Sequence, residues 1–240
     1  MNIEYLKWDS SFFGIKIGRV NLENELTFNP DKFQHFAKYE NFDLVYLIKY
    51  KEPISYGAIM DTKLDLVDVS VTMRRRLQND DSEKGQFSLR TSLSESELSD
   101  ALKIASDTSA VSRFNKEVKI GVEKTKELYK KWVSNALLGI HSDGIFLESI
   151  KGKVVGIHMI RTDHENAIGY FTMTGVDPLH IGLGIGNRLW TQSFNYWSKM
   201  NSIVEIRSPF SICNHGSFNF HLKMGFDKVH EIRYIYHYRT

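Results

Sequence analysis

The sequence predicts a mixed α/β fold, in which helices and strands alternate around one central sheet. Three closely spaced apolar runs at 145–149, 154–162 and 168–176 are separated by turn residues, which predicts an antiparallel meander. A helix, a strand, a second helix and a final strand are expected after the meander. With 240 residues and 42% apolar content, the chain is long enough for one large or two small domains.

A smaller α/β domain is expected in the first part of the chain. Its predicted elements are a helix near 31–39 and strands near 3–7, 44–50, 64–73 and 87–92. The charged segment 78–85 has no apolar periodicity, which indicates an exposed loop. We place the boundary near residue 92, so that the predicted domains are residues 1–92 and 93–240.

The second part carries clear helix signals. Ser94 and Glu97 have the spacing of a capping box, which marks the first turn of a helix. Leu128, Trp132 and Ala136 form an apolar stripe, so this helix is expected to face the core. The elements expected after the meander are a helix to about 199, a strand at 202–208, a helix from 214 and a strand at 226–238.

The composition argues against several classes of protein. The formal net charge is only +2, so the totals give no sign of a nucleic-acid partner. No apolar stretch approaches the roughly eighteen residues of a membrane span, and no signal peptide is evident, so a cytoplasmic protein without membrane contact is expected. Cys213 is the single cysteine and is expected to be buried and inert. The histidines lack metal-ligand spacing, so no metal is predicted.

The segment 176–189 joins an apolar strand to an amphipathic helix through alternate glycines. Gly182, Gly184 and Gly186 allow a tight turn, and the helix that they open presents unpaired N–H groups to an anion. The loop therefore favours a phosphate ligand. A dinucleotide is disfavoured because its fingerprint needs glycine where Asn187 stands, and a simple turn is the remaining alternative.

Three motifs in the second part agree in order with one family. They comprise Val176 with Pro178, then Gly182, Gly184, Ile185 and Gly186, and finally Asn214 with Lys223, Gly225 and Phe226. This order resembles the GNAT superfamily of N-acetyltransferases. The resemblance implies a GNAT fold, with a mixed, mostly antiparallel central sheet flanked by helices, and acyl-CoA (coenzyme A) as co-substrate.

Further segments resemble a narrower branch, the dTDP-fucosamine N-acetyltransferases. These segments are 6–14, 112–114, 128–132 and 236–239, and they extend the resemblance over the whole chain. The resemblance implies acyl transfer to the amine of a dTDP-linked amino-dideoxyhexose, in nucleotide-sugar biosynthesis for surface polysaccharide, and it suggests a homodimer. Acetyl and hydroxyacyl donors, and 3-amino and 4-amino sugars, all stay open.

The resemblance assigns the coenzyme A contacts mainly to backbone groups. Thr174 and Val176 are expected to bind the pantetheine arm, with the Thr174 N–H as oxyanion donor. Ile181 and Leu183 stand where the family usually has basic or amide side chains, so phosphate binding lacks charge assistance here. The full set expected to contact coenzyme A is Thr174, Val176, Ile181, Gly182, Leu183, Gly184, Ile185, Gly186, Asn187 and Asn214.

A histidine replaces the tyrosine that commonly protonates the leaving thiolate in this family. His221 stands four residues before Gly225, and it is expected to serve as acid if protonated or as hydrogen-bond donor if neutral. No general base stands out. His158, His180 and Glu205 are candidates, but each has a structural interpretation that is at least equally favoured.

The acceptor contacts are predicted on chemical grounds. Arg113 and Phe114 are chosen because arginine binds diphosphate with a fork of donors and an aromatic ring can stack on thymine. Tyr170 and Thr172 are expected to line the acceptor pocket. Two other functions stay open, a peptide or protein amine acetyltransferase and a non-catalytic sensor of acyl-CoA or nucleotide sugar.

Overall fold

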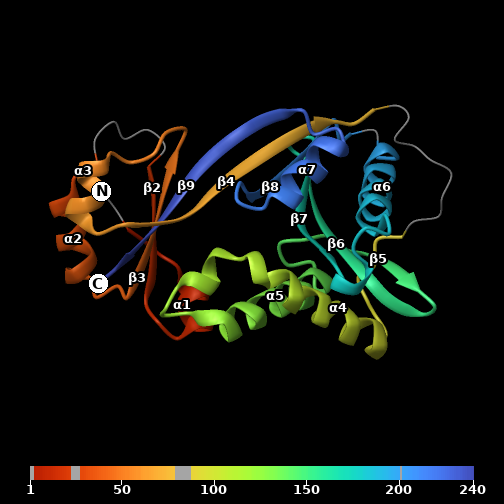
Figure 1. The fold of residues 1–240 in the computed structure, drawn as a ribbon, viewed down its shortest axis with the longest axis horizontal. Helices are drawn as coiled ribbons and strands as arrows, with labels where there is room; N and C mark the ends of the chain where they lie inside the picture. Colours follow the sequence, from red (N-terminus) through yellow and green to blue (C-terminus); the bar gives the residue numbers. More distant parts are fainter. Residues whose placement is uncertain (1–2, 23–27, 79–87, 201) are drawn as a thin grey trace. The chain divides into compact units, whose positions relative to one another are not determined.

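The structure is a computed structural model that describes residues 3–22, 28–78, 88–200 and 202–240. Its strands form a mixed nine-stranded sheet in the order β1-β2-β3-β9-β4-β8-β7-β6-β5, flanked by helices (Figure 1). The predicted α/β fold class is therefore confirmed.

The chain forms two compact units. The first comprises Met1–Thr72, Phe210–Phe218 and Val229–Thr240, and the second comprises Met73–Pro209 and Asn219–Lys228. The end of the chain thus returns to the first unit through segments that the sequence pattern assigned to the second domain. The division into domains of residues 1–92 and 93–240 stays a prediction.

In the first unit, strands of the sheet pack with helices α1, α2 and α3. Strand β2 pairs antiparallel with β1 and parallel with β3, and β3 pairs antiparallel with β9. Asn29 caps α2 by accepting the N–H of Lys32, and a proline begins that helix. The elements are β1 (Glu4–Tyr5), α1 (Lys7–Phe13), β2 (Ile17–Leu22), α2 (Pro30–Tyr39), β3 (Leu44–Tyr50), α3 (Tyr56–Thr62), β4 (Asp65–Arg76) and β9 (Lys228–Arg239).

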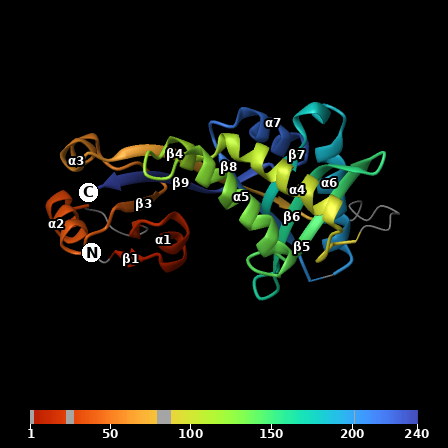
Figure 2. The ribbon, with the colours of Figure 1, turned by 90° about the horizontal axis from the view of Figure 1, so that it is seen from below.

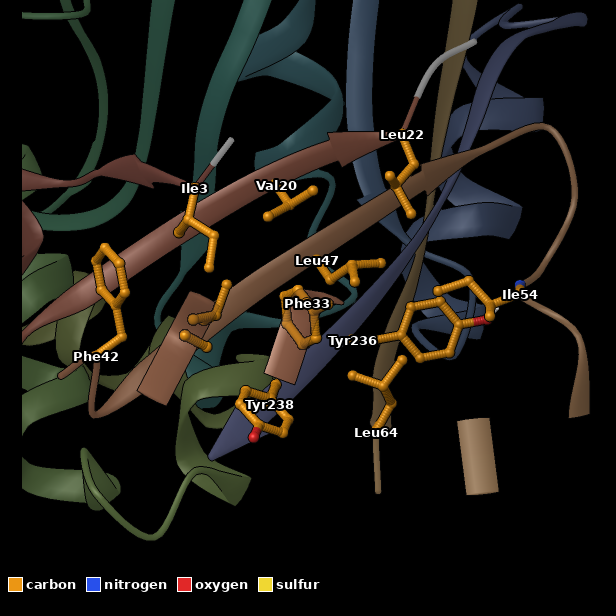
Figure 3. Packing of buried hydrophobic residues seen from close by; sticks show 12 residues of the cluster. Ile3, Val20, Leu22, Phe33, Phe42, Leu47, Ile54, Leu64, Tyr236 and Tyr238 are labelled. Carbon is orange, nitrogen blue, oxygen red and sulfur yellow. Dashed lines mark hydrogen bonds between the residues drawn. The ribbon is translucent and has the colours of Figure 1, made fainter. Parts of the chain in front are cut away.

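The core of the first unit packs α2 against the strand faces. Phe33 from α2 is fully buried and meets Tyr238 edge to face, with 4.9 Å between ring centroids. Figure 3 shows Phe33 close to Leu47 and Tyr238. The ring of Tyr236 is also buried, and its hydroxyl accepts the N–H of Ile54 at 3.1 Å, so the polar end of the ring is satisfied.

The second unit places helices on both faces of a meander. Strands β5, β6 and β7 pair antiparallel, with α4 and α5 packed on one face and α6 on the other (Figure 2). The elements are α4 (Glu95–Thr108), α5 (Gly121–Leu137), β5 (Gly144–Ile150), β6 (Lys153–Asp163), β7 (Ile168–Val176), α6 (Ile185–Ser198), β8 (Glu205–Ser211), α7 (His215–Lys223) and the 3-10 turns Ser109–Val111, Arg113–Lys116 and Pro178–His180.

Local signals in the second unit are confirmed. Ser94 accepts the N–H of Glu97, and the Glu97 carboxylate accepts the N–H of Ser94, which completes the predicted capping box. Leu128 and Ala136 are buried, as their stripe predicted. A side chain at Gly156 would meet Ile185 at 2.4 Å, so the absence of a Cβ there lets the start of α6 lie directly on β6.

Some predicted elements near the beginning of the chain are wrong. The strand expected at 3–7 is only Glu4–Tyr5, because α1 begins at Lys7. Gly14, which follows the last residue of α1, adopts a left-handed backbone conformation and so ends the helix. The Ser10 hydroxyl accepts the N–H of Ile17 at 2.9 Å and donates to the Leu6 carbonyl, which fastens this short helix to the next strand. Strand β2 and helix α3 had no predicted counterpart.

The segment between the predicted domains also differs from expectation. Within 88–92 the structure has no strand, only an isolated bridge between Arg90 and Ile145. The predicted exposed loop at 78–85 lies, apart from Gln78, outside the described residues. The strand expected at 202–208 is shifted to Glu205–Ser211.

Cys213 is exposed, so the prediction of a buried cysteine is wrong. It lies in the turn before α7, where the N–H of Asn214 donates to the Ser211 carbonyl at 2.9 Å, and this turn keeps the cysteine at the surface. Among the helices that the structure describes, none has both the length and the apolar character needed to cross a membrane.

Candidate functional site

The glycine loop ends β7 and starts α6. Gly182 and Gly184 have φ angles of 88° and 74°, a region that residues with side chains rarely adopt. Helix α6 begins at Ile185 with no side chain capping its first turn. The N–H groups of Gly184 to Asn187 make no hydrogen bond in the part of the chain that the structure describes. Four free donors at the positive end of a helix form a suitable anion site.

Tight packing fixes the start of α6. A Cβ at Gly186 would lie 3.1 Å from the ring of Phe220, so this glycine lets α6 approach α7 closely. Ile181 and Leu183 are 71% and 57% exposed and bring no charge to the loop. Their exposure agrees with the expectation that backbone donors, and not these side chains, would hold an anion.

Strands β7 and β8 are parallel and separate early. Their pairing runs only from Ile168 opposite Glu205 to Tyr170 opposite Arg207, although β7 continues to Val176. On its other edge, β7 stays paired with β6 as far as Val176. The last residues of β7 therefore have no ladder partner on the β8 side among the described residues.

The direction of the free backbone groups follows from the pairing with β6. The N–H of Asp177 donates to Val155 at 2.8 Å and so points toward β6. Because N–H groups alternate sides along a strand, those of Val176 and Thr174 point away from β6, toward the edge where pairing with β8 has ended. The two residues expected to contact pantetheine thus present unpaired amides on one edge.

A buried polar cluster supports β7 on the face toward α6. The Thr174 hydroxyl lies 3.0 Å from Trp190 Nε1 and 2.8 Å from His158 Nδ1. It can accept from the indole, which is only a donor, and donate to the imidazole. The rings of Phe171 and Trp190 lie beside His158 and complete an aromatic enclosure.

His158 is fully buried, and this burial lowers the pKa of its imidazole from 6.5 to about 3. It is therefore neutral at physiological pH and has no exposed surface from which to take a proton. The candidate general base at this position is not supported.

The same burial makes stability depend on pH. Between pH 6.5 and about 3 the unfolded chain binds a proton at His158 and the folded chain does not, so the free energy of unfolding falls as the pH falls. Below pH 6, we expect His158 to lower the free energy of unfolding by about 1.4 kcal/mol for each unit by which the pH falls. Urea unfolding at several pH values should show a shallower acid loss for His158→Gln, and equal slopes would contradict the assignment.

His221 lies in the second unit, at the end of α7. It is only 2% exposed, and its Nε2 lies 2.7 Å from the Ser208 hydroxyl on β8. The rings of Trp190 and Phe226 meet it edge to face at 4.8 and 5.2 Å. Ser208 follows Arg207, the last β8 residue paired with β7, so His221 is held at the place where the two strands separate.

The other candidate bases lie elsewhere. Glu205 accepts from Arg74 and Arg207, and although burial opposes the effect, these two cations lower its pKa overall. It pairs opposite Ile168, at the opposite end of β7 from Thr174. His180 lies in the loop, 3.5 Å from the Asp177 carboxylate. Within the described ranges, no group of three or more His, Cys, Asp or Glu side chains could hold a metal.

The predicted acceptor residues are not all accessible. Phe114 is only 5% exposed, and the Arg113 guanidinium lies over its ring at 4.3 Å, so the expected stacking of this ring on thymine is not supported. The ring is covered because Ser112 caps the 3-10 turn that directs it inward. Tyr170 carries the Arg161 guanidinium over its ring at 4.4 Å, and Thr172 bonds Ser142 at 2.9 Å.

Asn214 belongs to the first unit. Its side chain accepts the N–H of Ser217 at 3.0 Å, and its carbonyl accepts the N–H of Phe218, so it caps α7. The sequence analysis missed the contributions of Trp190 and Ser208. Trp190 belongs to the apolar face of α6, and nothing in the sequence distinguishes it from an ordinary core residue.

The mixed sheet, the separating parallel strands and the uncapped glycine-rich helix start together define a GNAT-like fold. Residues 111–226, just under half of the chain, match the model of the Acetyltransferase (GNAT) family. Over these residues the chain is thus similar to the GNAT acetyltransferases. No curated protein matches the sequence significantly.

Solved structures of low sequence identity share the fold. A functionally unknown conserved protein from Staphylococcus epidermidis is 12% identical, with 94% of this chain and 84% of that chain covered and a TM-score of 0.63. A GNAT-family acetyltransferase from Colwellia psychrerythraea is 9% identical, with 100% of both chains covered and a TM-score of 0.55. At these identities the likeness concerns the fold alone.

Proposed function

We propose that this chain transfers the acyl group of an acyl-CoA to the amine of a dTDP-linked amino-dideoxyhexose. The observation that carries the donor half of this proposal is the run of N–H groups from Gly184 to Asn187, which make no hydrogen bond in the described chain. Such donors, at the positive end of α6, suit the diphosphate of coenzyme A. The match of residues 111–226 to the GNAT family model supports the same donor.

The reaction needs help at two atoms. The amine nitrogen attacks the thioester carbonyl, a C–N bond forms, and the carbonyl oxygen becomes an oxyanion. The C–S bond then breaks, the thiolate takes a proton, and the nitrogen loses its proton to water. We propose the Thr174 N–H as oxyanion donor, since it faces the open edge of β7, and one such donor contributes about 2.7–4 kcal/mol.

We propose His221 as the group that supplies a proton or hydrogen bond to the leaving thiolate. Its position on α7 corresponds to the tyrosine of the family motif, and it lies against Ser208 where β8 leaves β7. An imidazole can donate a hydrogen bond from its ring N–H when neutral, or a proton when it is charged.

The acceptor proposal has separate support. It depends on the sequence resemblance, whose segments 6–14 and 236–239 lie in the first unit. Arg113 remains the proposed diphosphate contact, whereas Phe114 is covered. Tyr170 and Thr172 remain proposed contacts of the sugar. They lie on β7, which is paired with β8 only as far as Tyr170. A peptide amine is the alternative acceptor.

A thiol-release assay tests donor and acceptor together. Acetyl-CoA is offered with dTDP-3-amino and dTDP-4-amino dideoxyhexoses and with lysine peptides, and free thiol is followed. We expect release with one of the dTDP sugars. Release with peptides alone would replace the acceptor, and tight coenzyme A binding without release for any amine would indicate a sensor instead of an enzyme.

The loop conformation gives a matched pair of variants. Gly182→Ala and Gly139→Ala introduce a methyl group at φ angles of 88° and 71°, and neither methyl would meet another atom within 4 Å. Both should cost about 1–2 kcal/mol of stability through backbone strain. Only Gly182→Ala should weaken coenzyme A binding, by about tenfold, because strain turns loop N–H groups away from the phosphate.

Calorimetric titration with coenzyme A measures this difference, and thermal unfolding checks that the two variants are equally strained. Gly139 lies between α5 and β5, at the end of the meander where Gly144 pairs with Ile160, whereas the loop follows Val176 at the other end. Equal affinities of the two variants for coenzyme A would show that the loop does not contribute to coenzyme A binding.

A further inference from the structure

We propose that Arg188 is a positioning residue that fixes the peptide between Leu183 and Gly184 and thereby aims the Gly184 N–H at the phosphate. This inference rests on the proposed function, because it concerns the donor half of that site. Ile181 and Leu183 bring no charge to the loop, and this chain uses instead a backbone donor that Arg188 orients.

Arg188 links the loop to the sheet. Its Nη1 donates to the Leu183 carbonyl at 3.1 Å, and its Nε donates to the Glu148 carboxylate of β5 at 2.8 Å. The second oxygen of Glu148 accepts Gln192 Nε2 at 2.6 Å. Gln192 is buried on α6 and the Glu148 side chain is nearly so, which gives the guanidinium a rigid support.

The bond to the carbonyl sets the direction of an N–H group. A trans peptide is planar, so its C=O and N–H point in opposite directions, and the described residues contain no cis peptide. When Arg188 holds the Leu183 carbonyl, the Gly184 N–H must point away from the guanidinium. This N–H has no acceptor among the described residues and is the first of the free run.

The loop needs this support because its own conformation is weakly determined. Gly182 and Gly184 flank the peptide and allow wide rotation. Among the described residues, the one backbone acceptor of the Leu183 N–H is the His180 carbonyl, at a long 3.5 Å. Without Arg188 the Leu183–Gly184 peptide could rotate, and its N–H would no longer converge with those of the first turn of α6.

The test compares coenzyme A with dephospho-coenzyme A, which keeps the diphosphate and lacks the 3′-phosphate. Arg188→Met should weaken the binding of both ligands by the same factor, about tenfold, as expected when one hydrogen bond to a charged group is lost. The kcat at saturating acetyl-CoA should change less than twofold. Arg188→Lys, which can keep only part of the linkage, should lie between wild type and Arg188→Met.

Lys126→Met is the matched control, because it removes the same charge from an exposed ion pair with Glu123 on α5. It should leave both affinities unchanged. Weakening of coenzyme A alone would show a direct ion pair with the 3′-phosphate and overturn the inference, as would unchanged binding of both ligands by Arg188→Met. Failure of the wild-type protein to bind either ligand would instead overturn the proposed function itself, and this inference with it.

Discussion

Replacing His221 by phenylalanine is expected to lower kcat by about 10²- to 10⁴-fold, the usual contribution of a general acid, with little change in coenzyme A affinity. The phenyl ring can keep the edge contacts with Trp190 and Phe226, so the loss should come from chemistry and not from packing. Initial rates of thiol release, with calorimetric titration of coenzyme A, separate the two effects.

Two further variants make the His221 result specific. His221→Tyr restores the residue that the family motif carries, and it should keep more activity than His221→Phe. Ser208→Ala removes the 2.7 Å partner of the imidazole and should cause a smaller loss. Full turnover by a folded His221→Phe protein would show that this histidine is only a core residue.

Replacing Thr174 by valine is expected to lower the free energy of unfolding by roughly 2–5 kcal/mol, because two buried polar groups lose their partner. The Trp190 indole N–H and His158 Nδ1 both bond the Thr174 hydroxyl, and valine has the same shape without it. The backbone N–H is kept, so the protein that remains folded should still bind coenzyme A. Urea unfolding measures the loss.

Controls on the same strand separate this network from a general effect of losing a hydroxyl. Thr174→Ser keeps the hydroxyl and should recover most of the stability. Thr172→Val removes the hydroxyl of an exposed residue that bonds the single partner Ser142, and it should cost much less. A Thr174→Val protein as stable as wild type would show that the cluster contributes nothing to holding β7.

Features that depend on neighbouring residues could be predicted from the sequence. The capping box at Ser94 and the apolar run at 154–162 are local patterns, and both appear where expected. The glycine loop was also recognisable, because glycine at φ > 0 and the helix start after it are local requirements. These features include the part of the candidate site that would hold the phosphate.

Features that depend on tertiary contacts could not be predicted. Helix α1 has a strand-like aromatic composition and forms because Gly14 ends it and Ser10 bonds the next strand. The burial of Phe114 results from the way its turn packs, which spacing alone does not reveal. The network of Thr174 with Trp190 joins residues sixteen apart on different elements, and no single-sequence pattern reports such a pair.

The free N–H groups at the start of α6 are the centre of this account, and amide NMR tests them most directly. The ¹⁵N-labelled protein is titrated with coenzyme A, and the amide signals of residues 184–187 are followed, with Gly139 and Gly144, at the opposite end of the meander, as references. We expect the proton signals of 184–187 to move downfield as the diphosphate binds, while the references stay in place. Saturation with coenzyme A that leaves these four signals unmoved would contradict the account.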